Sequence, residues 1–158
     1  MELMFKTGKG RFNYRVGAII IHNGRILMVK NNRAPYFYSV GGRVKFDETC
    51  DEAVKREVKE ELGVDLEIDR PVFLHELFFD EGTTKEHFHE VSIYFLMKTP
   101  ENVEKIICAS VDERGSREEL CWIQIEKFGG YEAYPNFFAT ELMRLPTSLK
   151  RIVEIRNR

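Results

Sequence analysis

The chain has 158 residues, of which 43% are hydrophobic and 12% aromatic, so it is long and apolar enough to bury a core. Its net charge of −2 excludes a general attraction to nucleic acid, and no apolar run reaches the roughly 18 residues of a membrane span. We therefore expect one domain over residues 1–158, with residues 1–11 loose or only partly paired.

The three cysteines, Cys50, Cys108 and Cys121, show no spacing typical of a zinc site. Their odd number leaves one thiol unpaired in any disulfide scheme, and the N-terminus shows no secretory signal. We therefore expect reduced thiols and a cytoplasmic location.

The first part of the chain is predicted to form strands. Residues 14–21 and 25–30 are rich in strand-forming residues, and they flank Asn23 and Gly24, a strong short signal for a hairpin. A loop over residues 31–35 follows. The aromatic stretch that comes next, residues 36–40, predicts a short strand that runs into two glycines.

A central helix is predicted over residues 51–62. This segment contains strong helix formers and no proline. Thr49 and Glu52 have the spacing of a capping box at its start, and Gly63 is placed to end it.

The rest of the chain is predicted to be rich in strands and to end in a helix. We expect, in order, extended chain over 66–79 with a break near Pro71, a turn over 80–85, a strand over 88–97, a turn over 100–102, a charged loop over 111–119, a strand over 121–125 and a helix over 135–144. The basic C-terminus predicts a solvated helix face or a frayed end, with a contact to a phosphate or a partner as the alternative. The order of elements predicts an α/β fold, a mixed β-sheet flanked by helices.

One segment carries acidic residues at fixed spacing. The pattern G-x5-E-x7-R-E-V-x-E-E-x-G-V occupies residues 42–64. On the predicted helix Glu57, Glu60 and Glu61 share one face, because they lie three and four positions apart. Carboxylates this close repel one another unless a cation lies among them, and hard oxygen ligands suit Mg²⁺ or Mn²⁺. A solvated acidic face is the plain alternative, but the glycines, the arginine and the first glutamate of the pattern favour a metal site.

Residues 42–64 resemble the signature box of the Nudix hydrolases, and every fixed position of that box is present. The resemblance implies an α/β/α sandwich in which the box forms a loop, a helix and a loop. It also implies Mg²⁺- or Mn²⁺-dependent hydrolysis of a small-molecule nucleotide, a nucleoside diphosphate linked to another group X. Just upstream, Val40 stands where the family usually has proline, which we expect to alter the rigidity of the loop and to leave the catalytic residues intact.

The resemblance also implies roles for residues in and beside the box. The implied metal ligands are the carboxylates of Glu57, Glu60 and Glu61 and the carbonyl of Gly41. Glu57 is also the candidate base for the attacking water. Arg56 is expected to orient the carboxylates, and Glu48 is expected to be an outer-shell ligand.

Candidates for substrate binding outside the box have weaker signals, and a core or surface role is the alternative for each. A nucleobase needs a flat apolar wall, for which we consider Phe12, Tyr36 and Phe78. Arg43, one of several basic residues before the central helix, is a candidate for holding an outer phosphate. His89 is a candidate for a contact with substrate or metal.

Members of the family often supply one more acid from a loop after the box. Here Glu119 or Glu118 would be that acid, and a solvated turn is the alternative. His87 and Glu90, which flank His89, are further candidates for a contact with substrate or metal.

Two functions other than hydrolysis are compatible with a fold of this kind. Loss of acidic residues from the box would favour a nucleotide-binding or sensing module without turnover, and no box acid is lost. An isomerase acting on a diphosphate uses a related fold with a different acid–base set and a larger chain. The X group stays open, with nucleoside triphosphates and nucleotide sugars both fitting the pattern. The oligomeric state is also open, and a homodimer is one expectation, because many relatives pair through sheet edges or terminal segments.

Overall fold

The structure, a computed structural model, describes residues 1–30, 35–114 and 119–157. The strands in these residues are β1 (Met4–Thr7), β2 (Gly10–Ile19), β3 (Ile21–His22), β4 (Arg25–Lys30), β5 (Phe37–Arg43), β6 (Ile68–Asp80), β7 (His87–Met97), β8 (Glu119–Gln124), β9 (Ala133–Tyr134) and β10 (Lys150–Ile155). The helices are α1 (Cys50–Leu62), α2 (Val103–Arg114), α3 (Phe138–Glu141) and the 3₁₀ helix η1 (Ile125–Gly130).

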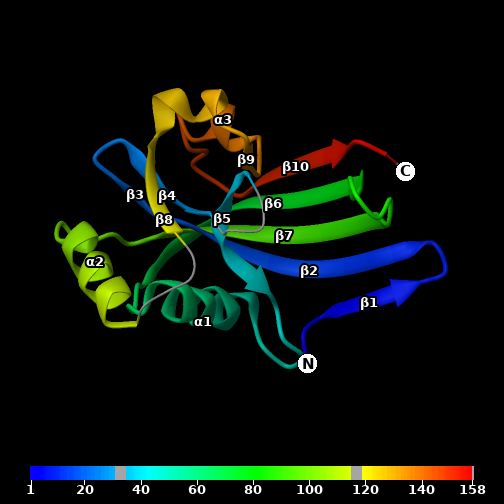
Figure 1. The fold of residues 1–158 in the computed structure, drawn as a ribbon, viewed down its shortest axis with the longest axis horizontal. Coiled ribbons are helices and arrows are strands. Elements are labelled where there is room, and N and C mark those ends of the chain that lie inside the picture. Colours follow the sequence, from blue (N-terminus) through cyan, green and yellow to red (C-terminus); the bar gives the residue numbers. More distant parts are fainter. Residues whose placement is uncertain (31–34, 115–118, 158) are drawn as a thin grey trace.

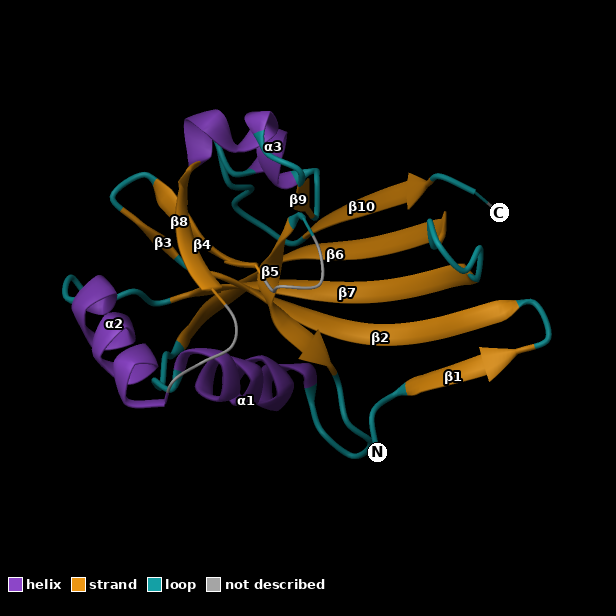
Figure 2. Cartoon of the chain, viewed as in Figure 1, coloured by secondary structure: helices purple, strands orange, loops and turns teal. Residues whose placement is uncertain are grey.

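The strands form a mixed sheet in the order β10-β6-β7-β2-β5-β4-β3, with β1 paired to β2, β8 to β4 and β9 to β5. Strand β2 runs parallel to β7 and β10 runs parallel to β6, whereas β6 and β7 are antiparallel. Figure 1 and Figure 2 show α1 and α2 on one side of the sheet and η1 with α3 on the other. The predicted mixed sheet flanked by helices is therefore confirmed.

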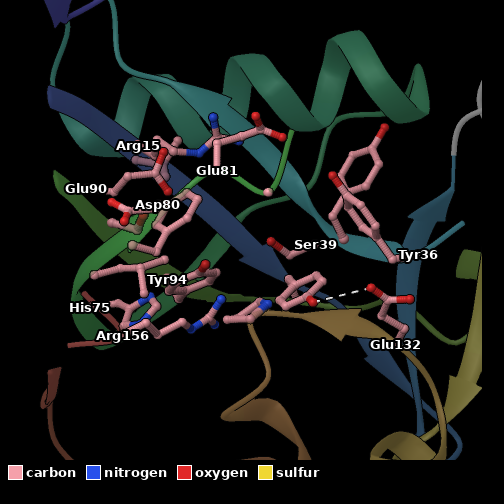
Figure 3. A pocket seen from close by; sticks show the side chains of 18 residues that line it. Arg15, Tyr36, Ser39, His75, Asp80, Glu81, Glu90, Tyr94, Glu132 and Arg156 are labelled. Atoms are coloured by element: carbon pink, nitrogen blue, oxygen red, sulfur yellow. Dashed lines mark hydrogen bonds between the residues drawn. The ribbon is translucent and has the colours of Figure 1, made fainter. Parts of the chain in front are cut away.

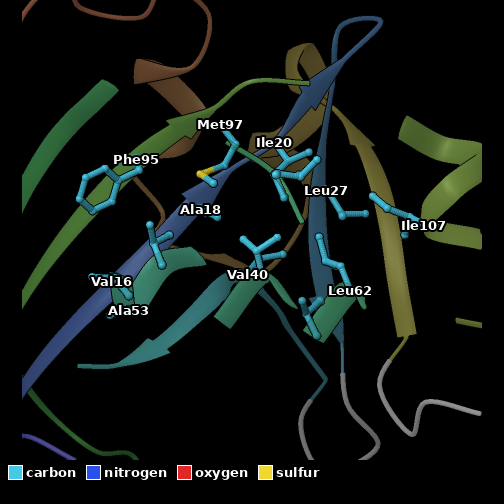
Figure 4. Packing of buried hydrophobic residues seen from close by; sticks show 14 of the residues in the cluster. Val16, Ala18, Ile20, Leu27, Val40, Ala53, Leu62, Phe95, Met97 and Ile107 are labelled. Carbon is cyan, nitrogen blue, oxygen red and sulfur yellow. The ribbon is translucent and has the colours of Figure 1, made fainter. Parts of the chain in front are cut away.

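The apolar stripe of α1 holds this helix on the sheet. Val54, Val58 and Leu62 are fully buried, and they pack in one core cluster with Val16 of β2 and Val40 of β5. Figure 4 shows this cluster between the helix and the strands. Because the stripe fixes the rotation of α1 about its own axis, it also fixes the direction in which the acidic residues of the helix point.

Of the two states expected for residues 1–11, loose or partly paired, the structure shows the paired one, because β1 forms an antiparallel pair with β2. The predicted charged loop over 111–119 is wrong in its first part, since α2 extends to Arg114. Val103 and Ile107 lie one helical turn apart and are buried in the same core cluster as α1, which anchors α2 in spite of its charged sequence.

The C-terminal prediction is also corrected. The helix expected over 135–144 is the short α3, and the basic segment after it is a strand, β10, rather than a helix face or a frayed end. The backbone N–H and C=O groups of β10 form hydrogen bonds with β6. Ile152 packs against the second core cluster, which lies beneath η1 and α3. Pairing along the sheet edge thus orders a segment whose charge suggested solvent exposure.

The described residues contain no helix with the length and apolar character needed to cross a membrane. Cys50, Cys108 and Cys121 are free thiols, as the sequence predicts.

Replacement of Leu62 by alanine tests the anchoring of α1. Leu62 is fully buried, so we expect Leu62→Ala to lower the free energy of unfolding by about 2–5 kcal/mol. Leu149 is 52% exposed, and Leu149→Ala is the matched control, with an expected change below about 0.5 kcal/mol. Urea unfolding of both variants measures the difference, and equal effects would contradict this account of the core.

Candidate active site

Two glycines let strand β5 pass close to its neighbours beside α1. A Cβ atom on Gly41, whose φ is 152°, would lie 2.1 Å from the carbonyl oxygen of Val16 on β2. A Cβ atom on Gly42 would lie 2.4 Å from Oε1 of Glu57. Because only glycine lacks that atom, the carboxylate of Glu57 can lie directly against the backbone of β5.

The helix that carries the acids begins and ends where the sequence predicts. The N–H of Glu52 donates to Oγ1 of Thr49 at 3.1 Å, and the N–H of Thr49 donates to the carboxylate of Glu52 at 2.8 Å, which completes the capping box. At the other end Gly63 has a φ of 73°, and its N–H donates to the carbonyl of Lys59 at 2.9 Å. The acidic residues therefore lie in a helix that is capped at both ends.

The guanidinium of Arg56 joins the polar groups of the site. Its Nε donates to Oε2 of Glu48 at 2.7 Å and its Nη2 donates to Oε1 of Glu48 at 3.0 Å. Its Nη1 donates to Oε1 of Glu57 at 2.8 Å and to Oε2 of Glu60 at 3.2 Å. Its Nη2 also donates to the carbonyl of Arg43 at 3.0 Å. One cation thus contacts two box acids, the glutamate before the helix and the backbone of β5.

The acids of the site lie in different environments. The side chain of Glu57 is 13% exposed, and its burial raises its pKa although Arg56 opposes the shift. The hydrogen bonds from Arg56 lower the pKa of Glu48 to about 2, so this carboxylate stays ionised. Glu60 is 53% exposed, and Oε2 of Glu61 accepts a hydrogen bond from the N–H of Gly41 at 2.9 Å.

The predicted metal ligands are therefore neighbours in the structure, each with a protein partner. Within the described ranges, no three acidic, histidine or cysteine side chains are placed to share one cation. Instead Arg56 holds Glu57 and Glu60, and the backbone of Gly41 holds Glu61. The carboxylates on one face of α1 and the carbonyl of Gly41 on β5 are all hard oxygen ligands, a set that fits a divalent cation such as Mg²⁺.

A cavity of about 530 Å³ opens on the sheet, and its lining includes Arg15 but neither Arg56 nor the box acids. Figure 3 shows the side chains that line it, which come from β2, β5, β6, β7 and the segments around β9 and after β10. Polar lining residues include Glu90 and Ser92 on one face of β7, together with Tyr94, which is buried at the cavity wall. The cavity is large enough for a small molecule of nucleotide size.

Arg15 connects the cavity with the acidic helix. It lines the cavity on β2, and it lies opposite Arg43 of β5 in the strand register. Burial raises the pKa of Glu57, and the positive charge of Arg15 is one of the groups that oppose this shift. Arg15 therefore acts electrostatically on both the cavity and the box.

The structure separates the predicted substrate residues. Tyr36 lines the cavity, with its ring edge-on to that of Tyr134 at 5.3 Å between centroids. Phe12, Phe78 and His89 do not line it. They form a row of contacting rings, with 5.4 Å between the centroids of Phe12 and His89 and 4.3 Å between those of Phe78 and His89.

Strand alternation explains why this aromatic row is outside the cavity. Phe12 and Phe78 both lie opposite His89 in the sheet register, so the three side chains share one face. Glu90, the next residue along β7, points to the other face and lines the cavity. Phe12 and Phe78, which we considered for the base, and His89, which we considered for a contact with substrate or metal, therefore lie outside this cavity, and their contact with a substrate stays a prediction.

Other predicted residues lie elsewhere. Arg43 is not among the cavity-lining residues, and its Nη1 donates to Oε2 of Glu2 at 3.0 Å. His87 contacts Asp80, with 2.8 Å between Nδ1 and Oδ1. Glu119 is exposed at the start of β8, opposite Lys30 in the register, and does not line the cavity. Glu118 lies outside the described residues.

Glu90, a candidate from the sequence for a contact with substrate or metal, does line the cavity. Ser92 and Tyr94 were not predicted, although they follow Glu90 at alternate positions of β7, which is the pattern of polar groups on one face of a strand. Glu132 and Tyr134, by contrast, come from a segment without a recognisable motif. The hydroxyl of Tyr134 donates to Oε1 of Glu132 at 3.4 Å.

The ion pair between Glu48 and Arg56 predicts a stability that depends on pH. The folded-state pKa of Glu48 is about 2, lowered from 4.5, so its contribution is present above about pH 5 and is lost as the pH falls toward 2. We expect Glu48→Gln to cost about 1–3 kcal/mol at pH 7 and less at pH 3. Urea unfolding at several pH values measures this difference.

Glu67 provides the control for that experiment. It is 71% exposed and forms a long contact of 3.4 Å with Lys55, so Glu67→Gln is expected to cost less than about 0.5 kcal/mol at every pH. A pH-independent loss in Glu48→Gln would show that the charge of Glu48 is not the cause.

Comparison with known proteins places this arrangement in a family. Residues 11–141 match the family model described as NUDIX domain. Similar solved structures include a MutT protein from Methanosarcina mazei Go1, with 24% identity, a TM-score of 0.54 and coverage of 85% of this chain and 91% of that one. No curated protein matches the chain.

Two further structures extend the likeness. An ADP-ribose pyrophosphatase from Streptococcus suis 89-1591 has 18% identity and a TM-score of 0.55, over 90% of this chain and 98% of that one. A NUDIX hydrolase from Nitrosomonas europaea has 14% identity and a TM-score of 0.57, over 83% and 86%. At these identities the structures show likeness of fold alone. The family match, however, spans most of the sequence and includes the whole acidic box, and the chain belongs to the Nudix hydrolase family.

Proposed function

We propose that the chain hydrolyses the diphosphate linkage of a small-molecule nucleotide, in which a nucleoside diphosphate is joined to a group X, and that residues 1–158 act as one domain in doing so. The observation that carries the proposal is the arrangement of the box acids around Arg56, together with a cavity that contains Arg15. Arg15, which lines the cavity and acts electrostatically on Glu57, is the link between the proposed cation ligands and the proposed pocket.

The cation is proposed to be Mg²⁺ or Mn²⁺. Glu57, Glu60, Glu61 and the carbonyl of Gly41 would hold it, and binding would exchange part of their contacts with Arg56 and with the backbone for coordination. When bound, the cation neutralises phosphate charge, stabilises the leaving oxygen and lowers the pKa of water. Glu48 keeps Arg56 in place and so acts from outside the ligand set.

Glu57 is the proposed general base. Its burial raises its pKa, which strengthens it as a proton acceptor, while the charges of Arg56 and Arg15 favour its ionised form at neutral pH. Because Oε1 bonds with Arg56, we assign the proton of the attacking water to Oε2. Attack at one phosphorus then releases a nucleoside monophosphate and a phosphorylated X.

The cavity is proposed to hold the rest of the nucleotide. Arg15 lies on the side nearest the box, where it would contact a phosphate. Tyr36 and Tyr134 present aromatic rings to the cavity, and such rings are suitable partners for a base or a sugar.

Neutral replacements of two box acids test the reaction. We expect Glu57→Gln and Glu60→Gln each to lower kcat about 100-fold or more, since each removes the negative charge of a proposed ligand of the cation. The assay measures nucleoside monophosphate release with Mg²⁺ or Mn²⁺ from nucleoside triphosphates, ADP-ribose, dinucleoside polyphosphates and CDP-alcohols. Asp65→Asn is the control, because Asp65 is 79% exposed and pairs only with Lys59 among the ion pairs described.

Each outcome of that assay has a meaning. Unchanged turnover in both variants would refute the assignment of Glu57 and Glu60. A wild-type protein that binds nucleotides and releases no product with either metal would instead favour the alternative function, a nucleotide-binding or sensing module.

The close approach of Gly42 to Glu57 gives a second test. The Cβ of Gly42→Ala would meet the far end of a flexible side chain, so we expect it to displace the carboxylate and to change the free energy of unfolding by less than about 1 kcal/mol. A displaced base should lower kcat about 100-fold. Gly8→Ala is the control, because no atom lies within 4 Å of the added methyl group. Equal activity of the two variants would contradict the proposed role of this contact.

A further inference from the structure

The C-terminal segment brings a second arginine to the cavity. Arg156 follows β10 directly and lines the cavity, where its Cζ lies 5.6 Å from the centroid of the Tyr134 ring. It lies beyond residues 11–141, so the family match says nothing about its role. Figure 3 shows Arg156 near His75, on a different part of the cavity wall from Arg15.

The side chain of Arg156 is held by a chain of polar contacts. Its Nη2 donates to Oε2 of Glu154 at 3.2 Å, and Oε1 of Glu154 lies 2.8 Å from Nε2 of His75. His75 is only 3% exposed and is therefore a fixed anchor. The contact with His75 lowers the pKa of Glu154, which keeps that carboxylate ionised beside the guanidinium.

The backbone on both sides of this side chain is also fastened. The N–H of Arg156 donates to the carbonyl of Phe78 at 2.9 Å. The side-chain amide of Asn157 donates to Asp80, which lines the cavity too. A group that is held before the ligand arrives loses little conformational entropy on binding, so these contacts prepare the guanidinium for a ligand.

The charges of the cavity favour an anion at this arginine. Among the described lining residues, Arg15 and Arg156 are the only arginine or lysine side chains, whereas the acidic ones are Asp80, Glu81, Glu90 and Glu132. Arg15 lies toward the box and the diphosphate to be cleaved. A further phosphate on the substrate would be repelled by these acidic side chains, and Arg156, which is 38% exposed, offers it a partner.

We propose that Arg156 is a specificity-determining residue that binds a phosphate group of X, so that the enzyme prefers nucleotides whose X carries a phosphate to those whose X is an uncharged sugar. The inference depends on the proposed hydrolysis. It concerns how substrates are distinguished, since Arg156 has no contact with the box acids in the described interactions.

The test compares substrates that share a nucleoside and differ in X. Values of kcat/KM are measured with Mg²⁺ for ATP against ADP-ribose and for GTP against GDP-mannose. We expect the wild-type enzyme to prefer the triphosphates. We expect Arg156→Ala to lower kcat/KM for the triphosphates about 10- to 100-fold, mainly through KM, and to change the values for the sugar nucleotides less than about 3-fold. Arg156→Lys should recover part of the loss, because it keeps the charge.

Arg151 is the matched control on the same strand. It is 67% exposed, does not line the cavity, and its Nε donates to Oε1 of Glu76 at 2.8 Å. Arg151→Ala should leave both classes of substrate unchanged. Thermal unfolding of each variant separates a loss of binding from a loss of fold.

Several results would overturn the proposal. Equal losses on both classes in Arg156→Ala would indicate base stacking or a structural role, and the absence of any loss would exclude a contact. A wild-type enzyme that prefers the sugar nucleotides would also contradict it. If the wild-type protein releases product from none of these four substrates but does so from another nucleotide of the wider panel, the role of Arg156 fails and the proposed hydrolysis stands. If it releases product from no nucleotide of that panel, both fail.

Discussion

The site depends on the hydrogen bonds and ion pairs that the guanidinium of Arg56 forms with the carboxylates around it. Three carboxylates on one helix face repel one another, and the repulsion grows where burial excludes water. Arg56 offsets it by donating to Glu57 and Glu60, and it also donates to Glu48 and to the carbonyl of Arg43 on β5. The same cation thus stabilises the acidic face and fastens α1 to the sheet. A lysine could not replace it, because a single ammonium lacks the planar fork that reaches partners in several directions.

Strand β5 contacts both the cavity wall and the acidic helix. The absence of a side chain on Gly17 of β2 leaves room for the ring of Tyr94, which a Cβ would approach to 2.4 Å. Burial raises the pKa of Tyr94 to about 12, and its hydroxyl hydrogen-bonds with Ser39 of β5. Tyr94 is therefore a neutral and fixed part of the cavity wall. Two residues beyond Ser39 the strand reaches Gly41, whose N–H holds Glu61, so one strand serves both the cavity and the acidic helix.

The features that the sequence predicted correctly are local in the chain. The capping box, the glycine that ends α1 and the spacing of the acids depend on residues a few positions apart, and the helix reproduces that spacing in space. The hairpin signal is of the same kind, since Asn23 and Gly24 adopt positive φ values of 51° and 71° in the turn between β3 and β4.

The cavity could not be predicted in the same way, because it depends on which strands pair and in what register. Phe12 and Phe78 were selected because they are aromatic. Each lies opposite His89 in the register, so both are on the face of the sheet opposite to the one where Glu90 lines the cavity. Tyr36 was selected by the same reasoning and does line the cavity. Residue type alone therefore cannot distinguish a ring that lines the cavity from a ring on the opposite face of the sheet.

Register also decides what the C-terminal segment contributes. Strand β10 pairs parallel to β6 with Glu154 opposite Leu77, and a shift of one residue would turn every side chain of β10 to the opposite face. Hydrophobic contacts specify this edge weakly, since Val153 and Ile155 are exposed. The contact between buried His75 and Glu154 specifies it better, because a slipped strand would leave His75 buried without that partner. A polar pair far from the box in sequence thereby fixes the register of β10, and with it the position of Arg156, the residue proposed to distinguish substrates.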